Sequence, residues 1–254
     1  MSELSLVLTY SLIIIAMILS YKGKVGLEKD LLIGSVRAVI QLSLIGVVLK
    51  YVFEIDNYFL TTVILIGMVY NATMVAAKRG GGLQKAKIIS FVAILSGLVV
   101  TLGILLLVQA ISYQPAQAIP VSGMVVGNSM VAMSLLLKNL QSSIKNSKDE
   151  IETKLCLGAS PYQAVKPIIS DSIKTSMLPT VDSMKTLGIV QLPGMMTGLI
   201  LAGIEPTNAI KYQVMVAFML SGAVPITAFI ASFWAYRVFF TDKAQLKKKK
   251  KTLA

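Results

Sequence analysis

The chain has 254 residues, of which 55% are hydrophobic, and its mean hydropathy is +0.75. A soluble domain usually holds about 45–50% apolar residues, so this composition excludes an ordinary soluble protein and indicates an integral membrane protein. The formal net charge of +12 would suggest nucleic acid in a soluble protein, but the positions of the cations explain it better here, and we expect no nucleic-acid partner. One cysteine, Cys156, excludes an intramolecular disulfide, and the lack of histidine excludes the usual zinc and haem ligand sets.

The chain opens with an apolar run that follows Glu3 and has no small-residue cleavage site, which predicts a membrane span and not a removable signal peptide. Crossing a bilayer takes about 20 apolar residues. The turn-forming stretch 112–120 divides one long uncharged run into two such segments. We therefore predict an all-α polytopic membrane protein, one transmembrane domain over 1–254, with spans at 4–21, 31–49, 57–77, 88–111, 120–137, 186–204 and 212–236.

Lysine and arginine gather in alternate loops. They follow the first, third and fifth predicted spans, whereas the other loops hold only Lys50 and Lys211, close to Glu54, Asp56 and Glu205. Cytoplasmic loops accumulate Lys and Arg. The pattern predicts an N-terminus outside and a C-terminus inside, and an even number of spans would break the alternation.

The chain ends in a basic tail, 241–254, with consecutive lysines at 247–251. Each lysine near an anionic lipid surface contributes about 1 kcal/mol of binding. The alternative is a solvated tail that only fixes the orientation of the protein. The sequence leaves both open.

The longest polar interruption between predicted spans runs from about 146 to 182. It predicts a short helix over 150–157 that ends at Gly158, because glycine accepts left-handed backbone geometry. Ser160 can cap a second helix, and Gln163, three residues later, completes a capping box. Apolar residues at helical spacing predict that this second helix lies along a surface: Val165, Ile168, Ile169, Ile173 and Met177.

Arg37 is an ionisable residue inside a predicted span, and Gln41, one turn later, shares its helix face. A charge at that depth is costly and usually points into the bundle or an aqueous pathway. The alternative is snorkelling, because Arg37 lies about 9 Å from the cytoplasmic start of its span at Leu31. Both interpretations stay open.

Two amides, Asn71 and Asn128, are predicted to be buried in the third and fifth spans, where they either bond between helices or line a pathway. Asn128 follows Gly123 and Gly127, a small-xxx-small pair of the kind that lets membrane helices approach closely. We expect helix packing to be the main role of these glycines.

Pro193 and Gly194 stand inside the sixth predicted span, and Met195 and Met196 follow directly. A break of this kind frees backbone carbonyls, which is tolerated at membrane depth where protein or a water-filled cavity satisfies them. Thioether sulfur is a soft metal ligand, but methionine is also a common packing residue. These four residues are therefore candidates for a pathway, and the metal ligands remain unknown.

The sequence carries no G-x-x-x-x-G-K-[ST] motif, so it lacks the phosphate cradle of a P-loop ATPase. Without histidine, no Ser/His/Asp or Cys/His constellation is possible. All acidic residues are predicted to lie in loops or at span ends. We expect a non-catalytic chain without a cofactor of its own, and ATP-driven transport would place ATP and Mg on another chain.

The polar interruption resembles the cytoplasmic EAA loop of ABC-transporter permeases, since Glu152 stands six residues before Gly158 and Ile168 ten after it. Several further motifs resemble the FetB-type permease family, which includes the plant aluminium-sensitivity permeases. These motifs are RAVIQL at 37–42, GMVVGNSM at 123–130, E-x-x-x-x-L-G-A-S at 152–160, LPGMMTGLILAG at 192–203 and KYQ at 211–213.

The resemblance implies a multi-pass permease subunit in the cell membrane, working as a homodimer with two copies of a separate ABC ATPase and exporting iron or another metal. It places Glu152, Gly158, Ala159 and Ser160 at the contact with the ATPase. Three alternatives stay open: a stand-alone secondary transporter or channel, a permease for an anionic or nucleotide-sugar-like solute, and a membrane-embedded assembly factor.

Overall fold

The computed structural model describes residues 8–81, 83, 85–190, 192–241 and 243–247, and within these ranges the structure is helical apart from loops and isolated bridge residues, which include the pair Phe240 and Leu246. The chain divides into two compact units, one ending at Asn57 and the other beginning at Tyr58. The predicted all-α class is confirmed. Of the predicted basic tail, residues 242 and 248–254 lie outside the described part of the chain.

The first unit is a helical hairpin of α2 (Ser11–Lys22) and α3 (Glu28–Ile55). Its turn is closed by Ser20, whose Oγ donates to Glu28 Oε1 at 2.8 Å and accepts from the backbone N–H of Leu27 at 3.1 Å. α3 is long and apolar enough to span a membrane. The described part of α2 is shorter than a span, and residues 1–7 of the predicted first span lie outside the described residues.

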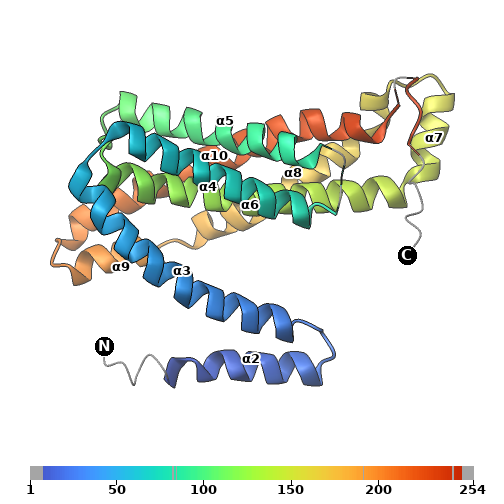
Figure 1. Ribbon diagram of the computed structural model, residues 1–254. Helices are drawn as coiled ribbons and strands as arrows, with labels where there is room; N and C mark the ends of the chain where they lie inside the picture. Colours follow the sequence, from blue (N-terminus) through green and yellow to red (C-terminus); the bar gives the residue numbers. More distant parts are fainter. Residues whose placement is uncertain (1–7, 82, 84, 191, 242, 248–254) are drawn as a thin grey trace. The chain divides into compact units, whose positions relative to one another are not determined.

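The second unit is a bundle of long helices joined by two short ones (Figure 1). α6 lies at its centre, because it packs against α4, α5, α8 and α10. The members of the bundle are α4 (Tyr58–Arg79), α5 (Ala86–Leu107), α6 (Pro115–Asn146), α7 (Lys148–Cys156), α8 (Pro161–Thr186), α9 (Gly194–Leu201), α10 (Pro206–Ala235) and the 3-10 helix η1 (Tyr236–Phe239).

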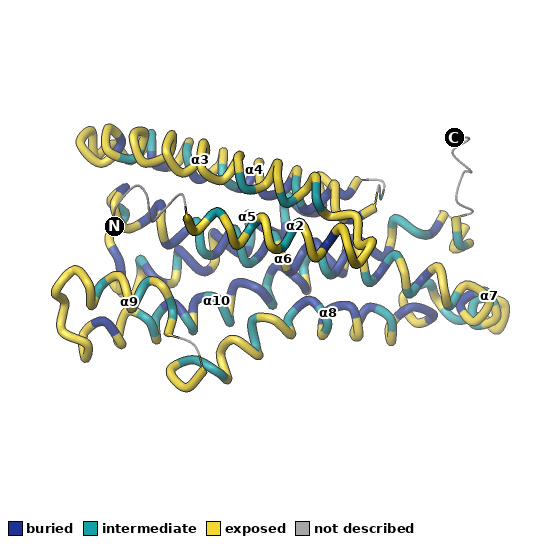
Figure 2. Tube along the Cα trace, turned by 90° about the horizontal axis from the view of Figure 1, so that it is seen from below, coloured by how far each residue is buried: buried dark blue, intermediate teal, exposed yellow. Residues whose placement is uncertain are grey.

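The core of this unit is apolar and closely packed. Its largest fully buried side chains include Ile94 on α5, Met133 and Leu136 on α6, and Val224 on α10. The buried residues follow the inward faces of the long helices, whereas α9 has none (Figure 2). α6 and α10 therefore form the scaffold against which the other helices are placed.

One glycine allows two helices to approach closely. A Cβ at Gly97 of α5 would collide with Thr227 Oγ1 and lie 3.2 Å from the Ala223 carbonyl of α10. Thr227 in turn donates to Ser129 Oγ of α6 at 3.1 Å. Of the predicted pair, Gly123 faces the flexible end of Met68, and Gly127 has open space beside it. The expectation of close packing therefore does not hold at Gly127.

Among the described residues, five helices are long and apolar enough to cross a membrane: α3, α4, α5, α6 and the continuous run of α10 and η1. They correspond to five of the predicted spans. α6 is longer than its predicted span of 120–137, and at 32 residues it extends for about 48 Å. α6 is therefore longer than a hydrocarbon layer of about 30 Å.

The predicted span at 186–204 is wrong as a single helix. α8 ends at Thr186, Gly188 has a φ of +81°, and Pro193 has the extended backbone of an N-cap. The helix that follows, α9, has eight residues, or about 12 Å. α8 instead runs through the unit from the end that holds α7 to the end that holds α9 (Figure 1).

α8 is not an uncharged segment of the sequence, which explains why hydropathy does not predict it as a span. Its apolar positions are interrupted by five charged residues: Lys166, Asp171, Lys174, Asp182 and Lys185. Its contacts with α6 and α10 bury one face, so it lies inside the bundle as much as along a surface. Asp171 and Asp182 both lie within α8, so these carboxylates belong to a helix of the bundle and not to an irregular loop.

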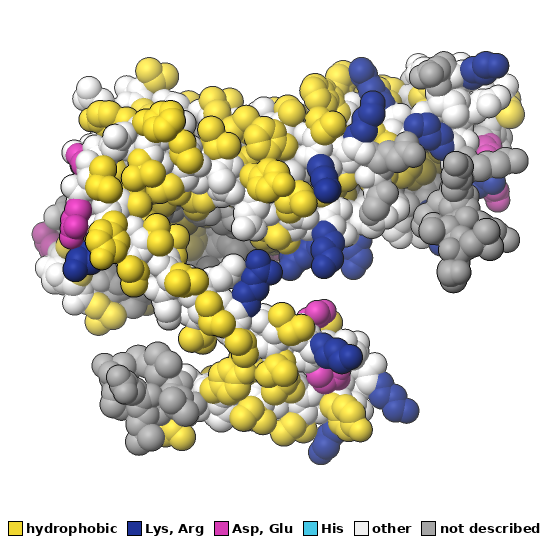
Figure 3. Space-filling model, viewed as in Figure 1, with side chains coloured by type: hydrophobic (Ala, Val, Ile, Leu, Met, Phe, Trp, Pro, Cys, Tyr) yellow, Lys and Arg dark blue, Asp and Glu magenta, His cyan; other side chains and the backbone are white. Residues whose placement is uncertain are grey.

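Basic side chains of the second unit gather at the end that holds α7 (Figure 3). The loop between α4 and α5 lies at this end, because Gln141 Nε2 of α6 donates to the Gly81 carbonyl at 3.1 Å. The other end carries Glu205 and Lys211 at the start of α10. The bundle thus has the charge asymmetry that the sequence predicted for its loops.

Candidate functional site

The first candidate site is the hook, which we define as α7, the turn 157–160 and the first turn of α8. α7 ends in a Schellman motif: the N–H of Gly158 donates to the Leu155 carbonyl and the N–H of Ala159 to the Lys154 carbonyl, both at 3.0 Å. Gly158 has a φ of +90° with open space around the position of a Cβ. Backbone geometry alone therefore calls for glycine here.

Two further devices begin α8 at a fixed angle. Ser160 and Gln163 form the predicted capping box, in which Gln163 Oε1 accepts from the Ser160 N–H at 2.8 Å and Ser160 Oγ accepts from the Gln163 N–H at 3.4 Å. Pro161 occupies the first helical position, where no amide donor is needed. The helix–glycine–helix prediction is confirmed in each of these details.

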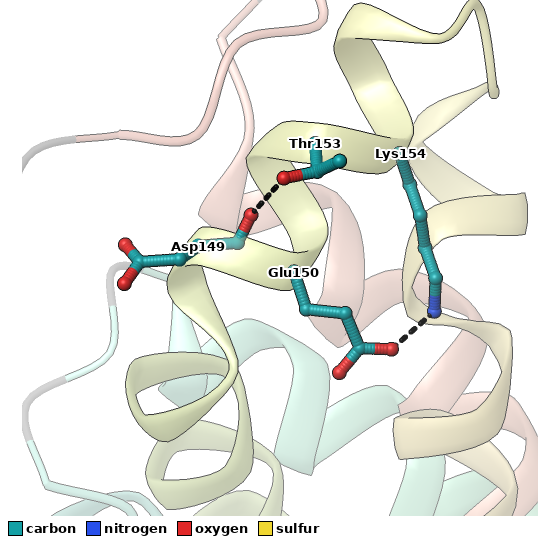
Figure 4. Close-up of polar contacts among 4 residues, drawn as sticks. All are labelled: Asp149, Glu150, Thr153 and Lys154. Atoms are coloured by element: carbon teal, nitrogen blue, oxygen red, sulfur yellow. Dashed lines mark hydrogen bonds and ion pairs between the residues drawn. The ribbon is translucent and has the colours of Figure 1, made fainter.

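Side-chain contacts one turn apart stabilise α7 itself. Lys154 Nζ lies 2.6 Å from Glu150 Oε1, and Thr153 Oγ1 donates to the Asp149 carbonyl at 2.8 Å (Figure 4). Glu152, a predicted contact residue, forms a longer ion pair of 3.6 Å with Lys148. Exposed pairs of this kind contribute only about 0.3–0.5 kcal/mol each. Glu152 is therefore free to exchange Lys148 for another cation at little cost.

The hook is anchored to the bundle on one side and exposed on the other. Ile151 of α7 is buried, and the ring of Tyr162 lies 5.6 Å from that of Tyr236, at the end of α10. Leu157, at the turn, is 83% exposed. Sequence reasoning missed Leu157, although an apolar residue directly before the glycine of a polar loop is a usable signal. An exposed leucine on a rigid turn is suited to a partner's apolar groove.

The second candidate site is a cavity of about 270 Å³ among α6, α8, the segment before α9, and α10. It brings together Asn128, Pro193, Gly194 and Met195, four of the predicted pathway residues. Its lining is Met124, Asn128, Thr180, Ser183, Met184, Leu187, Pro193, Gly194, Met195, Gln213, Val216, Ala217, Leu220 and Ser221.

The described lining of this cavity is mostly apolar, with five polar side chains and no formal charge. Gln213 Oε1 is buried and has no hydrogen-bond partner, which costs about 1–3 kcal/mol unless a ligand or water satisfies it. Ser221 Oγ lies 2.8 Å from Met184 Sδ, and Asn128 Nδ2 donates to the Met124 carbonyl at 2.8 Å. The cavity therefore offers amide, hydroxyl and thioether groups to a solute.

The remaining predicted pathway residues lie elsewhere. Met196 is half-buried but is not among the residues that line the cavity. Asn71 is exposed on α4, so the expectation of a buried amide there is wrong. Arg37 and Gln41 are exposed on α3 in the first unit. Sequence reasoning missed Gln213 as a cavity residue, although it had singled out the KYQ motif that contains it.

The described residues hold no group of three or more His, Cys, Asp or Glu side chains that could bind a metal ion. The cavity offers neutral donor groups instead. Amide and carbonyl oxygens suit harder cations and thioethers suit softer ones. The donor set alone does not select one metal.

Comparisons with known proteins give matches along most of the chain. The model of a family described as "Uncharacterised protein family (UPF0014)" matches residues 3–240. The protein named "Probable iron export permease protein FetB" of Escherichia coli is 46% identical over 242 residues, covering 95% of this chain and 93% of that protein. No solved structure shows significant similarity to the chain.

Two further relatives show how widely this similarity extends. The "UPF0014 membrane protein YjkA" of Bacillus subtilis is 42% identical, covering 97% of this chain and 99% of that protein. The "Protein ALUMINUM SENSITIVE 3" of Arabidopsis thaliana is 34% identical over 92% of this chain and 86% of its own length. The similarity therefore includes the hook, α8 and the cavity.

Proposed function

Because the chain belongs to the UPF0014 family of multi-pass membrane proteins, we propose that it is the permease subunit of an ABC transporter. Its motor is a separate ATPase subunit, which carries the ATP and Mg. Two permease chains and two ATPase chains form the working assembly, since one chain with a single hook supplies half of a two-fold motor.

The observation that carries this proposal is the hook. It is a short helix held at a fixed angle by a Schellman motif and a capping box, with Leu157 exposed at its turn. A motor that moves spans needs a rigid element to push on, because a flexible loop would absorb the motion. Gly158, Ala159 and Ser160 lie in this turn and Glu152 lies on α7, and the family resemblance implied the ATPase contact at these four residues.

The charge asymmetry of the bundle supports an orientation with the hook in the cytoplasm. In that orientation the chain passes the membrane seven times, and α8 makes the sixth passage in place of the predicted span 186–204. The N-terminus is then outside and the C-terminus inside. The last turns of α6 extend into the cytoplasm and carry α7.

The cavity is the proposed section of the transport pathway in each chain. It joins α8, which begins at the hook, to α10, whose end contacts the hook through Tyr236. The unsatisfied Gln213 Oε1 supports a solute-binding role, because a purely structural cavity gains nothing from such an atom. The cargo is a metal ion, with iron the first candidate, as the name of the E. coli relative indicates.

The proposal is tested by producing the chain with candidate ABC ATPase subunits from the same genome and purifying the complex in lipid nanodiscs. We expect a two-plus-two assembly by native mass spectrometry and ATPase activity above that of the ATPase alone. Leu157→Glu should abolish this stimulation, whereas Leu107→Glu, at the exposed end of α5 far from the hook, should leave it intact. A chain that transports alone, without any ATPase, would favour the secondary transporter.

A further inference from the structure

Three methionines from three separate helices line the cavity. Met124 lies on α6, Met184 near the end of α8, and Met195 in the first turn of α9. Met124 and Met195 are half-buried, whereas the side chain of Met184 is 44% exposed. The cavity therefore presents thioether groups to a solute that enters it, and at least one of them is reached from outside the bundle.

The sulfur of Met184 is available to a ligand. Ser221 Oγ lies 2.8 Å from Met184 Sδ, but it lies equally close to the Ala217 carbonyl of its own helix. A hydroxyl has a single proton, and a carbonyl oxygen is a better acceptor than a thioether. The Ser221 proton therefore goes to Ala217, and the lone pairs of Met184 Sδ stay free. Gln213 Oε1, which is buried without a hydrogen-bond partner, adds an oxygen with free lone pairs to the same cavity.

The charge of the cavity limits which metal ions it accepts. None of its described lining residues carries a formal charge. The idealised cost of taking an ion out of water rises with the square of its charge, so a monovalent ion meets about a quarter of the cost of a divalent one. The N-terminus of α9, beside Met195, also disfavours positive charge, and this effect is smaller for a monovalent ion. Thioethers in turn favour soft metals such as Cu(I) over hard ones.

We propose that Met124, Met184 and Met195, together with Gln213 Oε1, form a binding site for a soft monovalent metal ion, of which Cu(I) is the biological example. The site adds a second class of metal to the iron that the name of the E. coli relative indicates. The four side chains come from four helices, so the site depends on the arrangement of α6, α8, α9 and α10. This inference rests on the proposed function only for the place of the cavity in the transport pathway.

The first experiment measures the binding of Ag(I), a redox-stable probe for this class of ion, to the purified chain in lipid nanodiscs by isothermal titration calorimetry. All variants carry Cys156→Ser, because the exposed thiol would bind the probe itself. Met184→Leu and Met195→Leu conserve side-chain volume and should each weaken binding at least about tenfold. Met196→Leu, at a half-buried position outside the cavity lining, is the matched control and should bind Ag(I) as the parent does.

The second experiment tests the charge and the softness of the ion. Fe(II), supplied without oxygen in about tenfold excess, should leave Ag(I) bound, whereas the same excess of Cu(I) should displace it. Because a ligand that binds only the folded state stabilises it, Ag(I) should also raise the midpoint of thermal unfolding of the parent and of Met196→Leu. The same addition should raise the midpoint much less in Met184→Leu and Met195→Leu.

The outcomes separate the metal site from the proposed function. A parent chain that binds no Ag(I), or equal binding by all three methionine variants, would overturn the site even if the chain stimulates an ATPase. Displacement of Ag(I) by Fe(II) would overturn the preference for a soft monovalent ion. Ag(I) binding that depends on Met184 and Met195, in a chain that assembles with no ATPase, would leave the site standing and overturn the proposed function.

Discussion

Gly158 is the residue on which the geometry of the hook depends. Replacing it with valine forces a β-branched residue into left-handed geometry at a cost of roughly 1–2 kcal/mol, which tilts α7 against α8. We expect Gly158→Val to reach the membrane normally but to lose most ATPase binding, measured by co-purification. Gly158→Asn is the matched control: asparagine tolerates this backbone and the space is open, so binding should be retained.

Glycine is needed at Gly97 because of the space around it and not because of its backbone conformation. Its backbone is helical, but a Cβ there meets Thr227 and the Ala223 carbonyl of α10. Gly97→Ala should lower the free energy of unfolding by about 1–3 kcal/mol, seen as a lower midpoint of thermal unfolding in detergent. Gly103→Ala, on the same helix with open space around it, should leave the midpoint unchanged or raise it. Equal midpoints for the two variants would show that α5 does not approach α10 so closely.

Gly158 and Gly97 also show which structural roles of residues can be predicted from a sequence. The roles of Gly158, Ser160 and Gln163 could be predicted because caps and left-handed ends depend on neighbours within a few residues. The roles of Gly97 and Asn71 could not, because they depend on which face of a helix meets the bundle. Hydrophobicity is nearly uniform around these apolar helices, so their rotation is set by packing and not by pattern.

The cavity between α6, α8 and α10 permits a test in which stability and transport move in opposite directions. Gln213→Leu removes a buried acceptor without a partner, so it should leave stability unchanged or raise it by about 1 kcal/mol. The same variant should reduce transport several-fold, because the amide no longer meets the solute. Phe218→Leu, at an exposed position of the same helix, should change neither property. Full transport by Gln213→Leu would exclude this amide from the pathway.

At the level of whole elements, the sequence predicted five of the long helices, α7 and the start of α8. The sequence did not predict α8 as a long helix of the bundle, because hydropathy selects uncharged segments. α8 carries charged residues on the face at which the other helices present apolar side chains to lipid. The sequence instead predicted a membrane span in the apolar run that holds Pro193. Glycine and proline divide that run into pieces that are too short to cross a membrane.

The whole molecule should have its basic end in the cytoplasm. In the Cys156→Ser background, Lys211→Cys should react with a membrane-impermeant maleimide in intact cells, because it lies at the end of the bundle that carries Glu205. Lys85→Cys, in the loop after α4, should react only after the membrane is permeabilised. Reaction of both in intact cells would contradict the proposed topology, and the reverse pattern would place the hook outside.

Because α8 is a continuous helix, a small rotation at one of its ends produces a larger displacement at the other end. Its 26 residues extend for about 39 Å, with Pro167 and Pro179 inside the helix, the hook at one end and the cavity at the other. A tilt of about 5° at the hook displaces the far end by about 3 Å, comparable to the diameter of a water molecule. The ring contact between Tyr162 and Tyr236 holds the end of α10 at the hook, the point about which α8 tilts. A small movement of the ATPase at the hook would then produce a larger movement at the other end of α8, beside the segment that precedes α9. That movement would change the width of the cavity.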